Sequence, residues 1–170
     1  MKKSRFLLVT ILCFGLFSCI KQAPQLPSNK VIERNTDNAT LLKINNALTH
    51  REDSLIRIVA ERNGTFKKSP IGFWYKIFHT GHGTTIKDSA ICMFDFQSFK
   101  LDNTLIKAGS EKIIIGKKQA ITGIEEGLKM MQTGDSATFI IPWYLAFGMA
   151  GDNEVIPPYT SLICKIKVRN

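Results

Sequence analysis

Residues 116–128 read Gly-Lys-Lys-Gln-Ala-Ile-Thr-Gly-Ile-Glu-Glu-Gly-Leu and mark a change from strand to short helix. The segment before them, 112–115, is typical of a strand that ends at Gly116. A short helix fits residues 123–130, because its two glutamates lie in the first turn, where the helix dipole favours acidic side chains. This stretch therefore predicts a strand, a loop and a helix in succession.

Other strand-like segments surround this unit. Alternating or continuous apolar patterns predict further strands at 72–79, 91–101, 137–141 and 162–168. Asp102-Asn103 suits a tight hairpin turn, because both residues tolerate positive φ. A long loop rich in glycine and proline is expected over 142–158. Many strands, one short helix and one long loop predict a mostly antiparallel α+β fold.

The composition is that of a folded protein with one core. The chain has 170 residues, of which 44% are hydrophobic and 22% are charged. These values exclude wholesale disorder and a polytopic membrane protein. Four cysteines in this length also exclude a small scaffold built on disulfides. One domain with extensions is the expected organisation.

The first residues resemble an export signal. A short basic stretch precedes an apolar run over 6–17, which is too short to cross a bilayer comfortably. A buried core helix is the alternative. Ser18-Cys19 resembles the lipobox of bacterial lipoproteins, which predicts a signal peptide over 1–18 and lipidation of Cys19. We therefore expect a lipid-anchored protein of the cell envelope, held at the outer membrane and facing the periplasm.

A tether and a helical segment are expected next. Residues 19–36 contain two prolines and no apolar period, as in an extended linker. Residues 37–64 are expected to be helical, as one helix or as two with a break near Thr49, where Thr-His-Arg-Glu matches a capping box. The helical stripe consists of Leu41, Ile44, Leu48, Leu55 and Val59. It either packs on the following domain or forms a partner surface, with a homodimer as one possibility.

Several classes of chemistry have no motif here. The sequence has no glycine-rich phosphate loop, no Gly-x-Ser-x-Gly and no zinc-type spacing of Cys and His, so neither a cofactor nor a metal is expected. His79 and His82 flank a turn without nearby carboxylates, which favours incidental histidines. Cys92 and Cys164 favour buried free thiols over a disulfide. The basic residues are scattered without interleaved aromatics, so nucleic acid is not an expected partner.

Four motifs in register resemble the FKBP-type peptidyl-prolyl cis-trans isomerase domain. They are 116–128, Met131-Gln132-Thr133-Gly134-Asp135, Leu145-Ala146-Phe147-Gly148 and Ile156-Pro157-Pro158. The resemblance covers 72–170 and implies a curved antiparallel sheet wrapped on one short helix, with an apolar cleft between them. Together with the signal peptide, the helical segment and Phe73-Trp74-Tyr75, the chain is similar to FKBP-type envelope lipoproteins of Bacteroidetes-like bacteria, including one associated with gliding motility.

The resemblance implies catalysis of proline isomerisation. Rotating an X–Pro bond has a barrier of roughly 20 kcal/mol, which comes from lost amide resonance. A dry apolar cleft with a few hydrogen bonds can lower this barrier without a nucleophile or a metal. The implied partners are unfolded or proline-containing exported polypeptides. The alternative is a weakly active or non-catalytic FKBP-like chaperone, or an assembly subunit of a gliding or secretion machine.

The resemblance also implies the site residues. The expected catalytic residues are Phe96, Ile121, Phe147 and Ile156. The expected substrate-binding residues are Ile106, Ile113, Ala120, Ile124, Val155, Tyr159 and Cys164. Ile121 would donate its backbone N–H to the substrate carbonyl that follows proline. The alternative, strongest for Ile113 and Cys164, is that these are ordinary core residues.

The chain departs from the family pattern at several cleft positions. Phe147 and Phe96 keep the aromatic ring and lose a hydroxyl that is common in the family. Lys107 stands where an aspartate is usual. Ile124 and Cys164 replace aromatic residues. The expected cleft is therefore apolar, with fewer polar groups and less aromatic surface than is usual.

Overall fold

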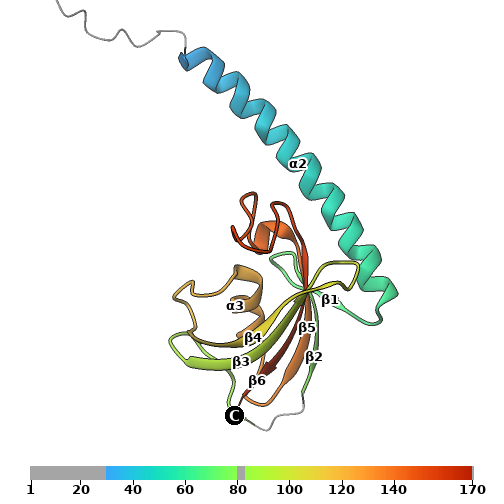
Figure 1. Cartoon of the computed structure of the whole chain (residues 1–170), viewed down its shortest axis with the longest axis vertical. Helices are drawn as coiled ribbons and strands as arrows, with labels where there is room; N and C mark the ends of the chain where they lie inside the picture. Colours follow the sequence, from blue (N-terminus) through green and yellow to red (C-terminus); the bar gives the residue numbers. More distant parts are fainter. Residues whose placement is uncertain (1–29, 80–82, 170) are drawn as a thin grey trace, which may run out of the picture. The chain divides into compact units, whose positions relative to one another are not determined.

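The computed structural model describes residues 30–79 and 83–169 (Figure 1). The expected signal peptide, Cys19 and the first part of the tether lie outside the described residues, as does His82. The chain divides into two units, 1–41 and 42–170. The described part of the first unit, 30–41, is helical, and the sheet belongs to the second.

Helix α2, Lys30–Arg62, is one continuous helix. The tether therefore cannot extend to residue 36, and the prediction that it does is wrong. No proline or glycine occurs between Pro27 and Gly64, so nothing in the sequence stops a helix from starting at Lys30. The possible break near Thr49 is absent from the described helix, where the Thr49 hydroxyl donates to the Asn45 carbonyl at 2.9 Å.

The C-terminal end of α2 packs on the sheet. Ile56 and Ala60 are each 1% exposed and cluster with Ile140 and Ile163 of the sheet. The helix ends as expected at Arg62, followed by Gly64 with φ +107°. Other apolar side chains of this helix are exposed, namely Leu41, Leu42, Ile44, Leu55 and Ile58. Of the stripe, Val59 packs against this cluster, whereas Leu41, Ile44 and Leu55 are exposed.

One six-stranded antiparallel sheet forms the body of the domain. Its strands are β1 (Lys67–Lys68), β2 (Trp74–Phe78), β3 (Ile91–Phe99), β4 (Leu105–Ile114), β5 (Ser136–Ile141) and β6 (Leu162–Val168). Their order across the sheet is β1-β2-β5-β6-β3-β4, so β4 is an edge strand. The expected α+β architecture, a curved antiparallel sheet around a short helix after an N-terminal helical segment, is confirmed.

The hairpin between β3 and β4 forms where it was expected, but β4 is longer than predicted. Asn103 takes φ +67° and its N–H donates to the Lys100 carbonyl at 3.0 Å. Strand β4 then begins at Leu105 rather than at residue 112. Its first seven residues include Gly109 and are almost all exposed, so no apolar alternation marks them as a strand.

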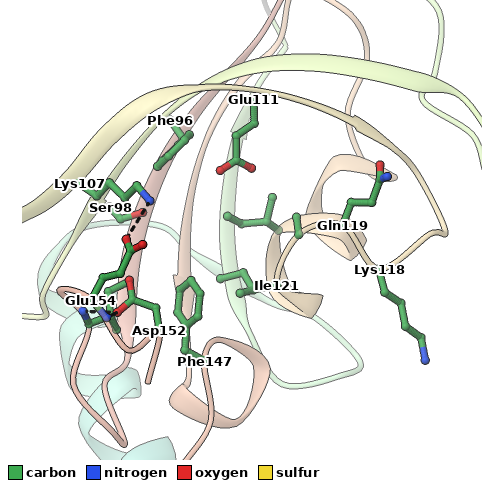
Figure 2. Close-up of a pocket in the computed structure, with 13 residues that line it drawn as sticks. Phe96, Ser98, Lys107, Glu111, Lys118, Gln119, Ile121, Phe147, Asp152 and Glu154 are labelled. Carbon is green, nitrogen blue, oxygen red and sulfur yellow. Dashed lines mark hydrogen bonds and ion pairs between the residues drawn. The ribbon is translucent and has the colours of Figure 1, made fainter. Parts of the chain in front are cut away.

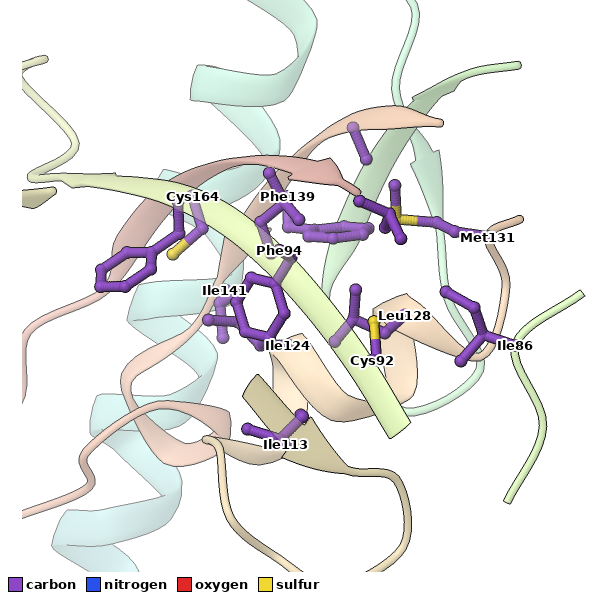
Figure 3. Close-up of a cluster of buried hydrophobic side chains, with 14 of the residues drawn as sticks. Ile86, Cys92, Phe94, Ile113, Ile124, Leu128, Met131, Phe139, Ile141 and Cys164 are labelled. Carbon is purple, nitrogen blue, oxygen red and sulfur yellow. The ribbon is translucent and has the colours of Figure 1, made fainter. Parts of the chain in front are cut away.

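Helix α3, Thr122–Leu128, packs closely on the sheet through two glycines. A Cβ on Gly127 would lie 2.7 Å from Cζ of Phe139, and one on Gly123 would lie 2.5 Å from Cγ2 of Ile141. Any larger residue would push the helix away from β5. Figure 3 shows the resulting core, with Leu128 and Ile124 of α3 beside the side chains of the sheet.

Both cysteines of the sheet lie in this core as free thiols, as predicted (Figure 3). Cys92 is 3% exposed and Cys164 is fully buried. Burial raises the pKa of Cys164 to about 12, although its Sγ lies 3.6 Å from Oγ of Ser98, a contact that lowers the pKa slightly. Both thiols therefore stay protonated in the folded protein.

Within the described ranges, neither α2 nor α3 combines the length and apolar character needed to span a bilayer.

Candidate functional site

A cavity of about 430 Å³ opens between the β3–β4 hairpin, α3 and the loop between β5 and β6 (Figure 2). Its lining residues come from all of these elements. They are Phe96, Ser98, Lys107, Glu111, Lys118, Gln119, Ala120, Ile121, Ile124, Phe147, Asp152, Glu154 and Ile156. Such a volume accommodates a few residues of an extended peptide or a small ligand.

The four expected catalytic residues meet in this cavity. Phe96 comes from β3, and its ring lies over Gly109 of β4, where an added Cβ would be 3.4 Å from the ring. Phe147 and Ile156 come from the β5–β6 loop, and Ile121 precedes α3. Phe96 and Ile156 are buried, so this part of the wall is shielded from water.

Ile121 is the N-cap of α3, and its backbone has two different roles. Its extended conformation, φ −60° and ψ 147°, lets its carbonyl accept hydrogen bonds from the N–H groups of Ile124 and Glu125 at 3.0 and 3.1 Å. Its own N–H donates to no acceptor among the described residues. A donor at the cavity wall is therefore available to a ligand carbonyl.

A carboxylate inside the β5–β6 loop fixes the position of Ile156. Oδ1 of Asp152 accepts hydrogen bonds from the N–H groups of Glu154, Val155 and Ile156 at 2.9, 2.9 and 2.7 Å. Desolvation acts to raise the pKa of Asp152, but these hydrogen bonds outweigh it and lower the pKa below its usual range. The loop thus keeps its shape with Asp152 ionised.

Glu125 fixes the opposite side of the cavity entrance. Its Oε1 accepts hydrogen bonds from the N–H of Gly116 and, at 3.4 Å, from that of Lys118. Glu125 is buried, with 6% exposure, and lies in the first turn of α3. Its carboxylate therefore holds the turn between β4 and α3 against the start of the helix. Nearby, Oε1 of Gln119 accepts from the Ile114 N–H at 2.7 Å, which closes the turn onto the end of β4.

The rim of the cavity carries more charge than the sequence resemblance implies. Glu111, Asp152, Glu154 and Lys118 line the cavity and were not among the expected site residues. Glu111 was missed because the expected strand began at residue 112. Had β4 been extended upstream from Ile113, strand alternation would have placed residues 111, 109 and 107 on the same inward face.

Only two of the seven expected substrate-binding residues line the cavity. Ala120 and Ile124 line the cavity. The other five, Ile106, Ile113, Val155, Tyr159 and Cys164, do not line it. Ile113 and Cys164 are buried core residues, and Ile106 packs against that core.

Val155 and Tyr159 instead face solvent. They are 53% and 45% exposed, and the Tyr159 ring lies 4.9 Å from that of Trp143. The hydrogen bonds of Asp152 explain the exposure of Val155, because they turn Ile156 inward and leave Val155 facing outward.

A histidine outside the cavity has a carboxylate neighbour, contrary to expectation. Nδ1 of His79 lies 3.0 Å from Oδ2 of the buried Asp135. No sequence pattern indicates this contact, because 56 residues separate the two groups. No three His, Cys, Asp or Glu side chains are grouped as a metal site in the part of the chain that the structure describes.

The profile of the family described as FKBP-type peptidyl-prolyl cis-trans isomerase matches residues 81–169, more than half of the chain. The chain belongs to the FKBP family. The isomerase class inferred from its motifs is thereby confirmed at the level of the family.

Individual relatives agree with this assignment. The FKBP-family chain is 27% identical over 119 residues to a probable FKBP-type isomerase, FkpA, of Neisseria meningitidis, covering 68% of this chain and 43% of the relative. A probable FKBP-type isomerase of Haemophilus influenzae is 30% identical over 106 residues, covering 60% and 44%. The chain thus spans less than half the length of these relatives.

The fold comparison extends over the whole chain. The crystal structure of FkpA from Escherichia coli superposes with a TM-score of 0.62 at 20% identity, covering all of this chain and 82% of that one. At this identity the likeness establishes the fold, and the chemistry has to be argued from the cavity itself.

Proposed function

We propose that this FKBP-family chain catalyses the cis-trans isomerisation of X–Pro bonds in the cavity at Phe96, Ile121, Phe147 and Ile156. The observation that carries the proposal is the Ile121 N–H, which has no acceptor among the described residues and lies beside the buried apolar side chains of Phe96 and Ile156. The donor holds a substrate carbonyl, and the apolar side chains surround the proline.

The catalytic effect comes from what the cavity excludes. Water stabilises the planar, polar amide, and the buried faces of Phe96 and Ile156 remove that water from the rotating bond. A rate gain of about 10⁵ requires only about 7 kcal/mol of transition-state stabilisation. Desolvation and one positioned hydrogen bond are the kinds of interaction that can supply this transition-state stabilisation.

The proposal is tested by Ile156→Asp in a proline-peptide isomerisation assay. A charge at this buried position draws water into the cavity and is costly to desolvate, so we expect isomerase activity to fall by at least about tenfold. Met149→Asp is the matched control, because Met149 lies in the same loop, is exposed and does not line the cavity. Circular dichroism checks that both variants are folded. A folded Ile156→Asp variant with full activity would show that catalysis occurs elsewhere.

We further propose that the protein works in the cell envelope on unfolded or proline-containing exported polypeptides, anchored through a lipid on Cys19. The basic and apolar start of the sequence and Ser18-Cys19 support this location. Cys19→Ser tests the anchor, since the variant should leave the membrane fraction and lose incorporation of labelled palmitate. Unchanged membrane association would refute lipidation at this residue.

A second candidate function is that of a weakly active chaperone or an assembly subunit of a gliding or secretion machine. The exposed apolar residues of α2, such as Leu41 and Ile44, favour it, because they offer a surface outside the cavity. Suppression of client aggregation by a chain without measurable isomerase activity would favour this candidate over the first.

A further inference from the structure

The cavity contains one carboxylate whose charge is not neutralised within the described structure. Five charged residues line the cavity: Lys107, Glu111, Lys118, Asp152 and Glu154. Their partners differ. Asp152 accepts three backbone N–H groups, and Glu154 lies 4.0 Å from the Lys107 ammonium. Among the described residues, none forms an ion pair or a side-chain hydrogen bond with Glu111.

The position of Glu111 directs this charge into the cavity. In Figure 2 its carboxylate points from β4 into the space between Phe96 and the start of α3, whereas the Lys118 side chain extends away from the cavity. Glu111 pairs with Phe94 in the register of β3 and β4, next to the pair formed by Phe96 and Gly109 on the same face. It therefore stands beside the aromatic wall against which a proline would pack.

The nearest lysine on the same strand face does not reach Glu111. Lys107 is four residues away along β4, about 13 Å at the backbone for an extended strand. Its ammonium lies on the side of Glu154, where Figure 2 marks the ion pair. Both members of that pair are more than half exposed, so the pair holds Lys107 only weakly. Lys107 and Glu111 thus present opposite charges at two ends of one wall.

We propose that Glu111 makes the cavity select prolines that have a lysine or arginine as the preceding residue. This inference rests on the proposed function, because it assumes that the X–Pro bond is bound in this cavity. A cationic side chain before the proline would meet the Glu111 carboxylate at the partly desolvated wall. An acidic side chain at that position would be repelled by the same charge.

The test compares blocked tetrapeptides of the form Ala-Xaa-Pro-Phe, in which Xaa is Lys, Met or Glu. Using the full mature chain, we expect kcat/KM to follow the order Lys, Met, Glu, with about a three- to tenfold ratio between Lys and Glu, as for a partly exposed ion pair. Raising the salt concentration from about 0.05 M to about 0.5 M should reduce that ratio, because salt screens the interaction.

Variants at residue 111 identify the group responsible. Glu111→Gln should bring the ratio between the Lys and Glu peptides close to one, and Glu111→Lys should invert it. Glu126→Gln is the matched control, because Glu126 is a surface glutamate of α3 that does not line the cavity, and it should keep the wild-type ratio. A wild-type enzyme that turns over all three peptides equally, or a Glu111→Gln variant that retains the preference, would overturn the inference.

Failure of this inference is distinguishable from failure of the proposed function. If the wild-type chain isomerises none of the peptides, the proposed activity fails, and the same charge series is then read by binding. Fluorescence anisotropy of the labelled peptides should still rank Lys above Glu, and Glu111→Gln should still remove that ranking. Equal binding of the three peptides would overturn the role of Glu111 whether or not the chain is catalytic.

Discussion

Glu125 and Glu126 are adjacent in the sequence and have different surroundings in the structure. Glu125 is buried and accepts hydrogen bonds from the backbone of the turn at residues 116–118. Glu126 lies at the surface, where its Oε1 is 2.9 Å from the Lys129 ammonium, which also pairs with Asp88. A comparison of variants at Glu125 and Glu126 therefore separates the stabilisation by a buried acceptor from that by a surface charge.

We expect Glu125→Ala to lower the free energy of unfolding by about 2 kcal/mol, because two backbone N–H groups lose a charged acceptor. The corresponding change for Glu126→Ala should be below about 1 kcal/mol, as for an exposed ion pair. Urea unfolding followed by circular dichroism measures both. Equal losses in the two variants would contradict the role given to Glu125.

The residues around the cavity differ in how well the sequence predicts their positions. Ile121, Phe147 and Ile156 could be placed at the cavity because their motifs stand in a known order, and Phe96 could be placed there because the resemblance extends over 72–170. Glu111 could not, because it lies in a stretch without apolar alternation, and its position depends on the strand register. The contact of His79 with Asp135 depends on tertiary structure alone.

Helix α3 can approach β5 closely because Gly123 and Gly127 have no side chains. Gly127→Ala should lower the free energy of unfolding, although alanine favours helices by roughly 1 kcal/mol. The new methyl group would lie 2.7 Å from Phe139, and overpacking of this kind costs roughly 1–3 kcal/mol. Adding Phe139→Leu should make the alanine less harmful, which a double-mutant cycle of unfolding free energies measures. Additive losses would contradict the proposed contact.

A second contact between elements joins α2 to the β5–β6 loop. The Tyr144 hydroxyl donates to Oδ1 of Asp53 at 2.7 Å. Burial, followed by this hydrogen bond, raises the pKa of Tyr144 well above its usual range. A group with a raised pKa in the folded state stabilises it fully below the unfolded pKa, about 10, and loses this contribution as the pH rises towards the folded pKa.

We therefore expect Tyr144→Phe to be less stable than wild type by about 1 kcal/mol near pH 8. Between about pH 10 and pH 11.5, wild type should lose stability more steeply than the variant, because its unfolded state releases a proton that its folded state retains. Urea midpoints at these pH values measure the difference. Parallel pH profiles would show that the hydroxyl is not protected in the fold.

The strands differ in how far the sequence determined them. Strand β6 was predicted at its observed bounds, 162–168, because three apolar residues, 162–164, are followed by alternation of apolar residues with Lys165 and Lys167. The first part of β4 was missed because an edge strand with both faces exposed needs no apolar pattern. The length of α2 was also underestimated, since a polar helix start has neither a proline nor an apolar period to mark it.

The exposed apolar residues of α2 have no covering surface in the described part of the chain. We expect residues 22–170 to form a homodimer through the N-terminal helical segment, which would bury Leu41 and Ile44. The double variant Leu41→Glu with Ile44→Glu should be monomeric in sedimentation velocity experiments. Asn46→Glu, on another face of the same helix, should remain dimeric. Wild-type chain that stays monomeric at high concentration would contradict the homodimer.

The two buried thiols of the sheet have a consequence for the lifetime of the molecule. Cys92 and Cys164 are unlinked and protonated inside the core, so oxidants reach them only when the sheet opens. Outside a reducing compartment, each such opening exposes two cysteines that can form a non-native disulfide and prevent refolding. Survival is then a matter of kinetics: the opening rate of the domain, more than the chemistry of sulfur, sets how long a molecule remains intact.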